Sequence, residues 1–260
     1  MTTIGKLSIK QSEANVRLTR RQKITIVALV FYWIVLATVT HIPIPQIVYR
    51  AQVSDKWLHF LAYMNLVFLL WFSISPDRKA SLRRGVVWLI FFATVAYGGL
   101  DELLQPYVGR SKDVWDFLAN AAGVSTGLIM FVFLPFWQAL LAVSAITIFG
   151  LTTLAKADLS KLVPISDAVF HILAYGGFAL VWAQFMNLYL PLRTAFTRFS
   201  LSVGVPLGFL LAVKAGALLL DRHFAMSDLL FSALAIITVV TAAHLAGFLR
   251  ACQRPEEKGV

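Results

Sequence analysis

Long apolar runs, separated by short polar or proline-containing breaks, set the pattern of this chain. Each run has about the 20 residues that an α-helix needs to cross the hydrocarbon core of a bilayer. The breaks are suited to end helices, because Pro43, Pro45, Pro106 and Pro191 lack the backbone N–H that a helix interior needs. The pattern predicts helices at 24–40, 57–75, 84–105, 114–134, 136–154, 167–190, 199–220 and 227–249.

The composition agrees with a chain whose main solvent is lipid. Hydrophobic residues make up 59% of the chain and the mean hydropathy is +0.76, whereas soluble domains are about 45–50% apolar. The first run contains Tyr32 and Trp33 and ends without a small-residue cleavage site, so it predicts a retained span rather than a signal peptide. We therefore expect an all-α, polytopic integral membrane protein with about eight transmembrane helices.

Basic residues indicate the orientation of these helices. With both termini in the cytoplasm, the inside segments hold fifteen Lys and Arg residues and the outside segments hold seven, which is the bias of the positive-inside rule. The net charge of +10 thus reports topology, and because no RNA- or DNA-binding motif accompanies it, we expect no nucleic-acid partner. The charge pattern thus places the basic segment at 1–23 and the tail at 251–260 on the cytoplasmic side of the membrane.

Two segments of the chain share rare polar residues at one offset of 112 positions. Residues 53–63 (VSDKWLHFLAY) resemble residues 165–175 (ISDAVFHILAY), and the same offset matches a second segment without a gap. We predict a duplicated four-helix unit, with copies at 24–135 and 136–250 that share one orientation because four spans are an even number. The matched pairs are Asp55 with Asp167, His59 with His171, Tyr63 with Tyr175, Arg110 with Arg222, and Asp116 with Asp228.

Polar and ionisable side chains gather at the predicted outer ends of the first-half helices. Such groups are costly in lipid and face the protein interior or water, and their spacings of three, four and seven residues put them on shared helix faces. The favoured interpretation is a structural ion-pair network, with Arg110 bound to Asp113 or Asp116 and Asp55 bound to His59; the alternative is a ligand or catalytic pocket open to the outside. The cluster comprises Asp55, His59, Glu102, Gln105, Arg110, Asp113, Asp116, Asn120 and Lys214.

The second copy keeps only part of this set, so a site would belong mainly to the first half. Glu102 corresponds to Lys214, a cation inside an apolar span. Two copies in the same orientation should be related by a pseudo-twofold axis along the membrane normal. Our hypothesis is that this axis brings Lys214 toward Glu102, so that the two residues pair and join the halves. The alternative is that Lys214 snorkels to the outer surface. The other replacements are Asp101 by Val213, Gln105 by Ala217, Asp113 by Ala225, and Asn120 by Ser232.

Three separated segments resemble the VanZ-like family in order and spacing: 55–63 (DKWLHFLAY), 101–105 (DELLQ) and 109–123 (GRSKDVWDFLANAAG). The resemblance covers about 24–134, and 140–250 look like a degenerate second copy. It implies a bacterial polytopic membrane domain associated with the cell envelope and with glycopeptide (teicoplanin-type) resistance. The positions carried over are Asp55, His59, Glu102, Gln105, Arg110, Asp113, Asp116 and Asn120.

Several functions fit these residues. The favoured one is a non-enzymatic envelope protein whose outward-facing site binds membrane lipid or a lipid-linked precursor. An enzyme acting on a lipid phosphate, with His59 as acid/base and Arg110 on the phosphate, is one alternative, and a small transporter or flippase is another. A metal site of Asp55, His59 and Glu102 has weak support because a single histidine with scattered carboxylates is not a typical ligand set, so we expect no cofactor or metal.

Overall fold

The computed structural model describes most of the chain and leaves its termini and several connections undescribed. Where it describes the chain, every regular element is a helix. The predicted cluster member Arg110 and its counterpart Arg222 lie outside the described residues. The described ranges are 18–41, 55–109, 112–154, 166–192, 194–220 and 225–252.

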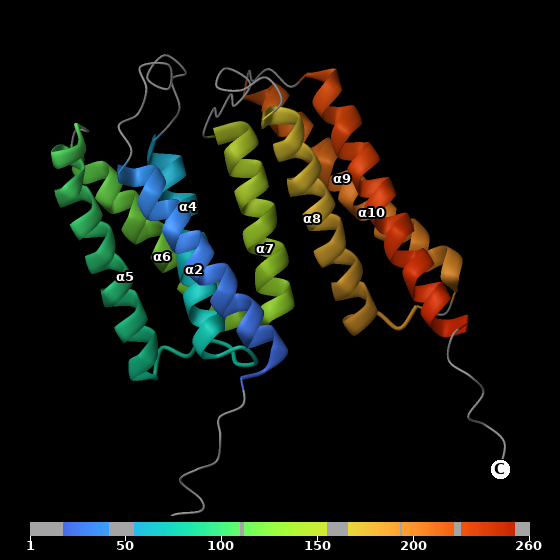
Figure 1. Cartoon of the computed structure of the whole chain (residues 1–260), viewed down its shortest axis with the longest axis horizontal. Helices are drawn as coiled ribbons and strands as arrows, with labels where there is room; N and C mark the ends of the chain where they lie inside the picture. The colour runs from blue at the N-terminus through green and yellow to red at the C-terminus, as the bar shows by residue number, and fades with distance from the viewer. Residues whose placement is uncertain are drawn as a thin grey trace, which may run out of the picture.

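Eight helices in these ranges are long and apolar enough to cross a membrane, which confirms the all-helical, multi-span prediction. They run alternately up and down, so the start of α2 and the end of α10 lie at one end of the molecule (Figure 1). The elements are α2 (Arg20–His41), α4 (Asp55–Ile74), α5 (Gly85–Leu104), the short 3-10 helix η1 (Gln105–Val108), α6 (Val114–Phe133), α7 (Phe136–Phe149), the π-helical η2 (Gly150–Leu154), α8 (Ser166–Tyr189), α9 (Ala195–Leu219) and α10 (Met226–Cys252).

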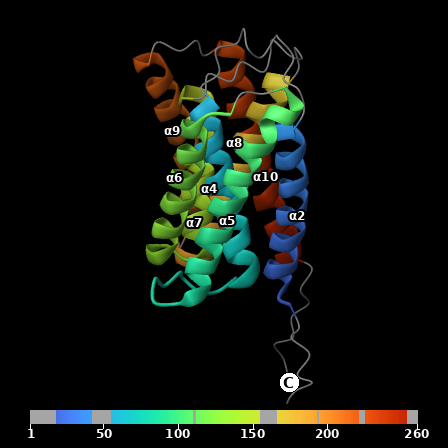
Figure 2. The ribbon, with the colours of Figure 1, turned by 90° about the vertical axis from the view of Figure 1, so that its left-hand side faces the viewer.

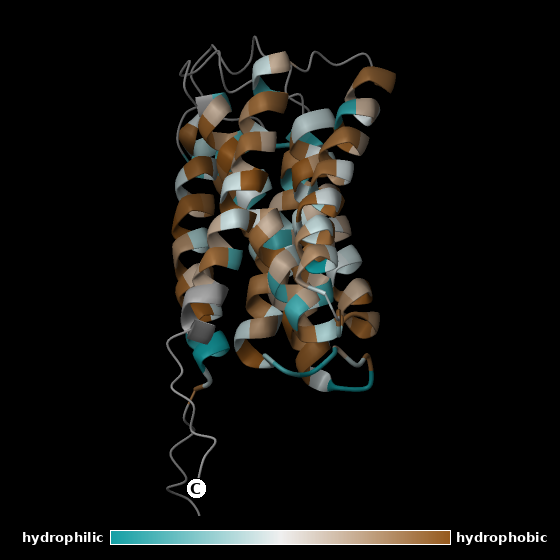
Figure 3. Cartoon of the chain, turned by 90° about the vertical axis from the view of Figure 1, so that its right-hand side faces the viewer, coloured by the Kyte–Doolittle hydropathy of each residue, from teal (hydrophilic) through white to brown (hydrophobic). Residues whose placement is uncertain are grey.

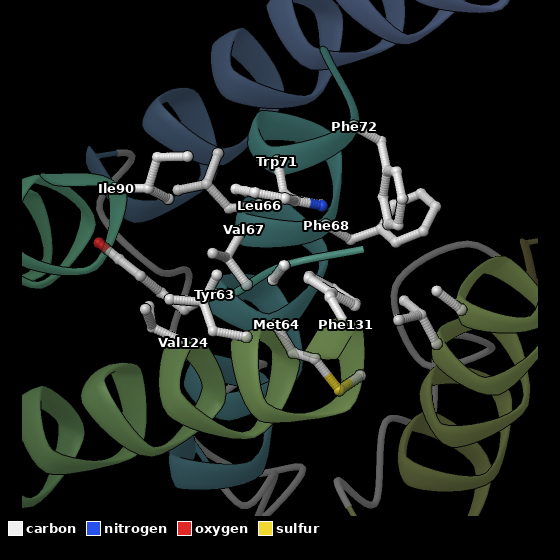
Figure 4. Packing of buried hydrophobic residues seen from close by; sticks show 14 of the residues in the cluster. Tyr63, Met64, Leu66, Val67, Phe68, Trp71, Phe72, Ile90, Val124 and Phe131 are labelled. Carbon is white, nitrogen blue, oxygen red and sulfur yellow. The ribbon is translucent and has the colours of Figure 1, made fainter. Parts of the chain in front are cut away.

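The helix α4 is the centre of the first half, where it contacts α2, α5 and α6 (Figure 2). Its aromatic side chains Phe68 and Phe72 pack against Phe131 of α6 in the buried core (Figure 4). The outward faces of the helices carry large apolar residues such as Phe31 and Leu89. Figure 3, a view of the right-hand side of the molecule in Figure 1, shows hydrophobic residues along the length of the helices. This distribution suits helices that bury one face in protein and show another to lipid.

Two glycines bring α4 and α6 unusually close together. A Cβ at Gly123 would lie 2.2 Å from the carbonyl oxygen of Phe60, and a Cβ at Gly127 would lie 2.6 Å from Cγ1 of Val67. Glycines four residues apart form one smooth helix face on which a neighbouring backbone can rest. The contact therefore sets the distance between α4 and α6 near the ends where both helices begin.

The second half repeats this set of helix contacts. The pairs α8–α10, α7–α8 and α9–α10 contact as α4–α6, α2–α4 and α5–α6 do. The small residue now lies on the first helix of the main pair, because Gly176 stands where the first half has Met64. A Cβ at Gly176 would lie 3.4 Å from Cγ2 of Val239 and 3.8 Å from Cβ of Ala235.

The two halves meet where α7 and η2 pack against α4. Asn65 of α4 donates a hydrogen bond to Thr147 Oγ1 of α7 over 2.8 Å. The helix α9 also contacts η2. The halves consequently lie side by side, with α5 and α10 at opposite edges of the molecule (Figure 1).

We expect Gly123→Ala to destabilise the protein by about 1–3 kcal/mol, because the methyl group must push α4 and α6 apart. Thermal or denaturant unfolding of the detergent-solubilised protein measures the change. Gly177→Ala is the matched control: a Cβ at Gly177 meets nothing within 4 Å, so this substitution should be neutral or slightly stabilising. Equal effects of both substitutions would contradict the role of the close contact.

Candidate functional site

Polar side chains gather where α4 and α6 begin and α5 ends, at the end of the molecule opposite the start of α2 (Figure 1). His59, Glu102, Gln105, Asp116 and Asn120 are all buried there, with at most 5% of each residue exposed. Gly98 of α5 makes room for them, because a Cβ at that position would lie 3.0 Å from Tyr63 Cε1 and 3.2 Å from Asn120. The structure thus brings together the described members predicted for the first half.

His59 is the centre of this cluster. Its Nδ1 lies 3.0 Å from Asn120 Oδ1 and 3.6 Å from Glu102 Oε1. Its Nε2 lies 3.6 Å from Asp55 Oδ1 and 3.9 Å from Asp116 Oδ2. The contact with Asn120 Oδ1 is a hydrogen bond in the tautomer that carries a proton on Nδ1, because an amide oxygen can only accept.

Several buried polar atoms around His59 have no hydrogen-bond partner among the described residues. Gln105 Nε2 donates to Glu102 Oε1 over 2.9 Å, but the second oxygen of Glu102, the hydroxyl of Tyr63, the Nδ2 of Asn120 and one oxygen of Asp116 make no such bond. An unsatisfied buried polar group costs about 1–3 kcal/mol. The described side chains therefore do not form a closed hydrogen-bond network, and they leave two carboxylate acceptors, one amide donor and one hydroxyl for another group to bond.

Lys56 forms the rim of the site. Its Nζ lies 3.0 Å from Asp113 Oδ2 and 3.6 Å from Asp116 Oδ1. Asp113 is the N-cap of α6 and accepts a hydrogen bond from the backbone N–H of Trp115 over 2.9 Å. That N–H, followed by Lys56, holds the pKa of the Asp113 carboxyl below its usual range. The sequence analysis gave Lys56 no role beyond topology, although its spacing of three residues from His59 puts both on one side of α4.

The buried carboxylate of Asp101 faces a different neighbour. His41 Nδ1 of α2 lies 3.7 Å from Asp101 Oδ1, and neither carboxylate oxygen has a hydrogen-bond partner in the described part of the chain. Asp101 thus adds a second buried carboxylate beside Glu102, on the side of α5 toward α2.

The corresponding residues of the second half adopt the same geometry around His171. Its Nε2 lies 3.8 Å from Asp167 Oδ1 and 3.8 Å from Asp228 Oδ2. Its Nδ1 lies 3.4 Å from Ser232 Oγ, which stands at the position of Asn120. The histidine and both carboxylates therefore recur 112 residues apart at the same end of the molecule (Figure 1).

The structure does not form the hypothesised pair of Lys214 and Glu102. Lys214 belongs to α9 and Glu102 to α5; α5 lies at one edge of the molecule, whereas α9 lies in the second half, beside α8 and α10 (Figure 1). The physical reason is that the halves join through α4, α7 and η2, so α9 packs on α8, α10 and η2 rather than on α5. Lys214 is consequently not a member of the cluster around His59.

An apolar cleft of about 270 Å³ lies beside the site, between the two halves. Trp57 and Leu61 of α4 line it, and they flank His59 in the sequence. Sequence reasoning missed this cleft because it depends on how α7 and α9 are placed against α4. The full lining is Trp57, Leu61, Ala145, Ile146, Phe149, Gly150, Leu154 and Phe209.

These features define a multi-pass helical membrane protein with a buried carboxylate–histidine cluster at one end. The chain belongs to the VanZ/LLP1 family, whose family model matches residues 3–135, just over half of the chain. The match confirms the resemblance and covers the half that contains His59. No curated protein and no solved structure matches the chain.

We expect Asn120→Leu to destabilise the protein by about 1–3 kcal/mol, because it leaves the buried Nδ1–H of His59 without its acceptor at nearly unchanged volume. Unfolding in detergent micelles measures this. Ser125→Ala, which removes only a hydroxyl bonded to the Ala121 carbonyl of the same helix, is the control and should cost clearly less. A loss for Asn120→Leu no larger than that of Ser125→Ala would argue against the His59–Asn120 bond.

Proposed function

We propose that this protein is a non-enzymatic VanZ-like envelope protein that binds a lipid-linked precursor, with the headgroup at the cluster around His59 and the hydrocarbon chain in the cleft between the halves. The observation that carries the proposal is that the two features share one helix. Trp57 and Leu61 face the cleft from α4, while His59, between them in sequence, faces the buried polar cluster.

The chemistry of the two features suits the two parts of such a lipid. The cleft is lined by apolar side chains and a glycine, as a hydrocarbon chain requires. The cluster offers unpartnered oxygens of Glu102 and Asp116, which would accept hydrogen bonds from the hydroxyl or amino groups of a headgroup. Lys56, with about half of its side chain exposed at the rim, supplies a cation for a phosphate.

We also propose that the cluster faces outward from the bacterial inner membrane and that both termini are cytoplasmic. Among the described residues, Lys56 and Lys112 lie at the cluster end. The opposite end holds a larger group of basic side chains, and the positive-inside rule places that end in the cytoplasm. This group consists of Arg20, Arg21, Lys23, Arg78, Lys79, Arg83, Arg84 and Arg198.

The two similar histidine clusters lead us to propose a duplicated four-helix unit as the origin of the chain. The matching helix contacts and the triads around His59 and His171 support this. The family resemblance extends the proposal to glycopeptide (teicoplanin) resistance. This extension is tested by measuring the minimum inhibitory concentration of teicoplanin for cells that produce the wild-type protein or the Asp116→Asn variant. It requires that the wild type raise the minimum inhibitory concentration and that the variant leave it unchanged.

An enzyme acting on a lipid phosphate is the second candidate, because a buried histidine flanked by carboxylates is also the arrangement of a general acid–base group. Phosphate release from a polyprenyl pyrophosphate by the purified protein, and its loss in His59→Gln, would favour this candidate over binding alone.

We expect Ile146→Trp to weaken binding of a polyprenyl-pyrophosphate-linked saccharide by about tenfold, which is ~1.4 kcal/mol, because the larger side chain fills the cleft. Native mass spectrometry of the detergent-solubilised protein measures the bound fraction, with phosphatidylglycerol as a competing lipid. Ile237→Trp on α10, at a similarly exposed isoleucine outside the cleft, should bind as the wild type does. If both variants bind alike, the cleft is not the chain-binding site.

The orientation is tested with single cysteines in a Cys252→Ser background. On intact cells, a membrane-impermeant maleimide should label the Lys112→Cys variant at the cluster end, whereas the Lys79→Cys variant at the other end should react only after lysis. Both positions are exposed in the structure, so accessibility within the protein does not limit either reaction. The reverse labelling pattern would place the cluster on the cytoplasmic side.

A further inference from the structure

The donor atoms around each histidine are arranged like the ligands of a bound cation. In each half, one nitrogen of the histidine and one oxygen from each of two aspartates all lie within 4.8 Å of one another. The measured separations of 3.6–3.9 Å between Nε2 and the carboxylate oxygens are too long for hydrogen bonds. They are close to the ~3.4 Å between two ligands that each lie about 2.1 Å from a tetrahedral ion.

The environment of Nδ1 points Nε2 at these carboxylates as an electron-pair donor. The Nδ1–H of His59 is used by Asn120 Oδ1, with Glu102 Oε1 as a further acceptor at 3.6 Å. In this Nδ1–H tautomer, Nε2 has a lone pair for a metal ion and faces the carboxylates of Asp55 and Asp116. A metal-binding histidine almost always donates its other N–H to such an oxygen, so Asn120 and Glu102 occupy the positions of supporting groups around a ligand set.

A second observation comes from Asp116 itself. The residue is 4% exposed, and its Oδ1 has no hydrogen-bond partner among the described residues. That oxygen instead forms an ion pair with Lys56, whose Nζ lies 3.6 Å away. Lys56 thus compensates the charge from the side of Oδ1, and the other oxygen, Oδ2, faces His59 Nε2 at 3.9 Å, inside the buried cluster.

A comparison of the two halves distinguishes the residues that carry the proposed ligand atoms from the residues around them. The second half replaces Glu102, Gln105, Asp113 and Asn120. It keeps the aspartate, the histidine and the second aspartate whose atoms converge. Ser232 Oγ takes the place of Asn120 at Nδ1.

We propose that Asp55, His59 and Asp116, and independently Asp167, His171 and Asp228, are two binding sites for a divalent transition-metal ion of the Zn²⁺ or Mn²⁺ class. One imidazole and two carboxylates suit these ions. Three protein ligands leave a coordination position open to water or to an oxygen of another ligand. The ligand set differs from the one considered from sequence, because Glu102 lies at Nδ1 whereas Asp116 lies at Nε2. The inference does not rest on lipid binding.

The experiment is metal titration of the full-length protein in detergent after treatment with a chelator, without added lipid. Isothermal titration calorimetry with Zn²⁺ and Mn²⁺, checked by elemental analysis after desalting, should give two ions per chain. Co²⁺ should give visible absorption bands of a nitrogen- and oxygen-ligated ion. Asp116→Asn and Asp228→Asn should each remove one ion, and the double variant both.

Two further variants show whether a loss of binding comes from the ligand set or from misfolding. Asp77→Asn, which changes an exposed carboxylate that pairs with Arg21 at the opposite end of the molecule, should keep two ions. Asn120→Leu should weaken the first site by about 10–100-fold, the usual effect of losing a supporting hydrogen bond, while the second site in the same molecule stays unchanged and reports that the chain is folded.

The proposal is overturned if the wild type binds neither ion, or if the double variant Asp116→Asn/Asp228→Asn binds as many ions as the wild type. Binding of a single ion that only Asp116→Asn removes would overturn the second site. Because the titration contains no lipid, each of these failures is distinguishable from a failure of the lipid-binding proposal.

Discussion

The close backbone contact between α4 and α6 is the constraint on which the rest of the structure depends. Gly123 leaves so little space that even a methyl group would overlap the carbonyl oxygen of Phe60. Phe60 follows His59 directly, and Gly123 lies one turn beyond Asn120. The contact therefore sets the distance at which the histidine of one helix meets the polar face of the other, and without it the His59–Asn120 bond would be out of reach.

The second half shows that the helix separation matters more than the position of any one glycine. There the small residue is Gly176 on α8, and it faces Ala235 and Val239 of α10. Small residues permit close helix approach whichever helix carries them, because the distance depends on the sum of the two facing side chains. The outcome is the same, since His171 again lies beside a carboxylate of the partner helix, Asp228.

The site combines two features with different physical origins. The polar cluster is tolerated because it lies where helices begin and end, so part of its cost is met by water and by rim groups such as Lys56. The apolar cleft exists because α7 and α9 approach α4 at its other side. A lipid headgroup would bond carboxylate oxygens of Glu102 and Asp116 that lack a hydrogen-bond partner among the described residues, whereas a metal ion would use the oxygens of Asp55 and Asp116 that face His59 Nε2. The two ligands are compatible because a three-ligand metal site leaves a position open.

The sequence by itself determined the eight membrane spans, and most of their ends lie within a few residues of the prediction. The reason is that a run of about 20 apolar residues in lipid can satisfy its backbone hydrogen bonds only as a helix. It also determined which residues of the same helix lie near each other, such as Asp55 and His59, which are four residues apart. Only the tertiary structure decided that Asp116 rather than Glu102 faces Nε2, that α9, which carries Lys214, packs on α8 and α10 instead of on α5, and that a cleft opens beside Trp57. These features depend on the rotation and spacing of helices far apart in the chain, which side-chain packing at Gly123 and Thr147 sets and which periodicity along one helix does not encode.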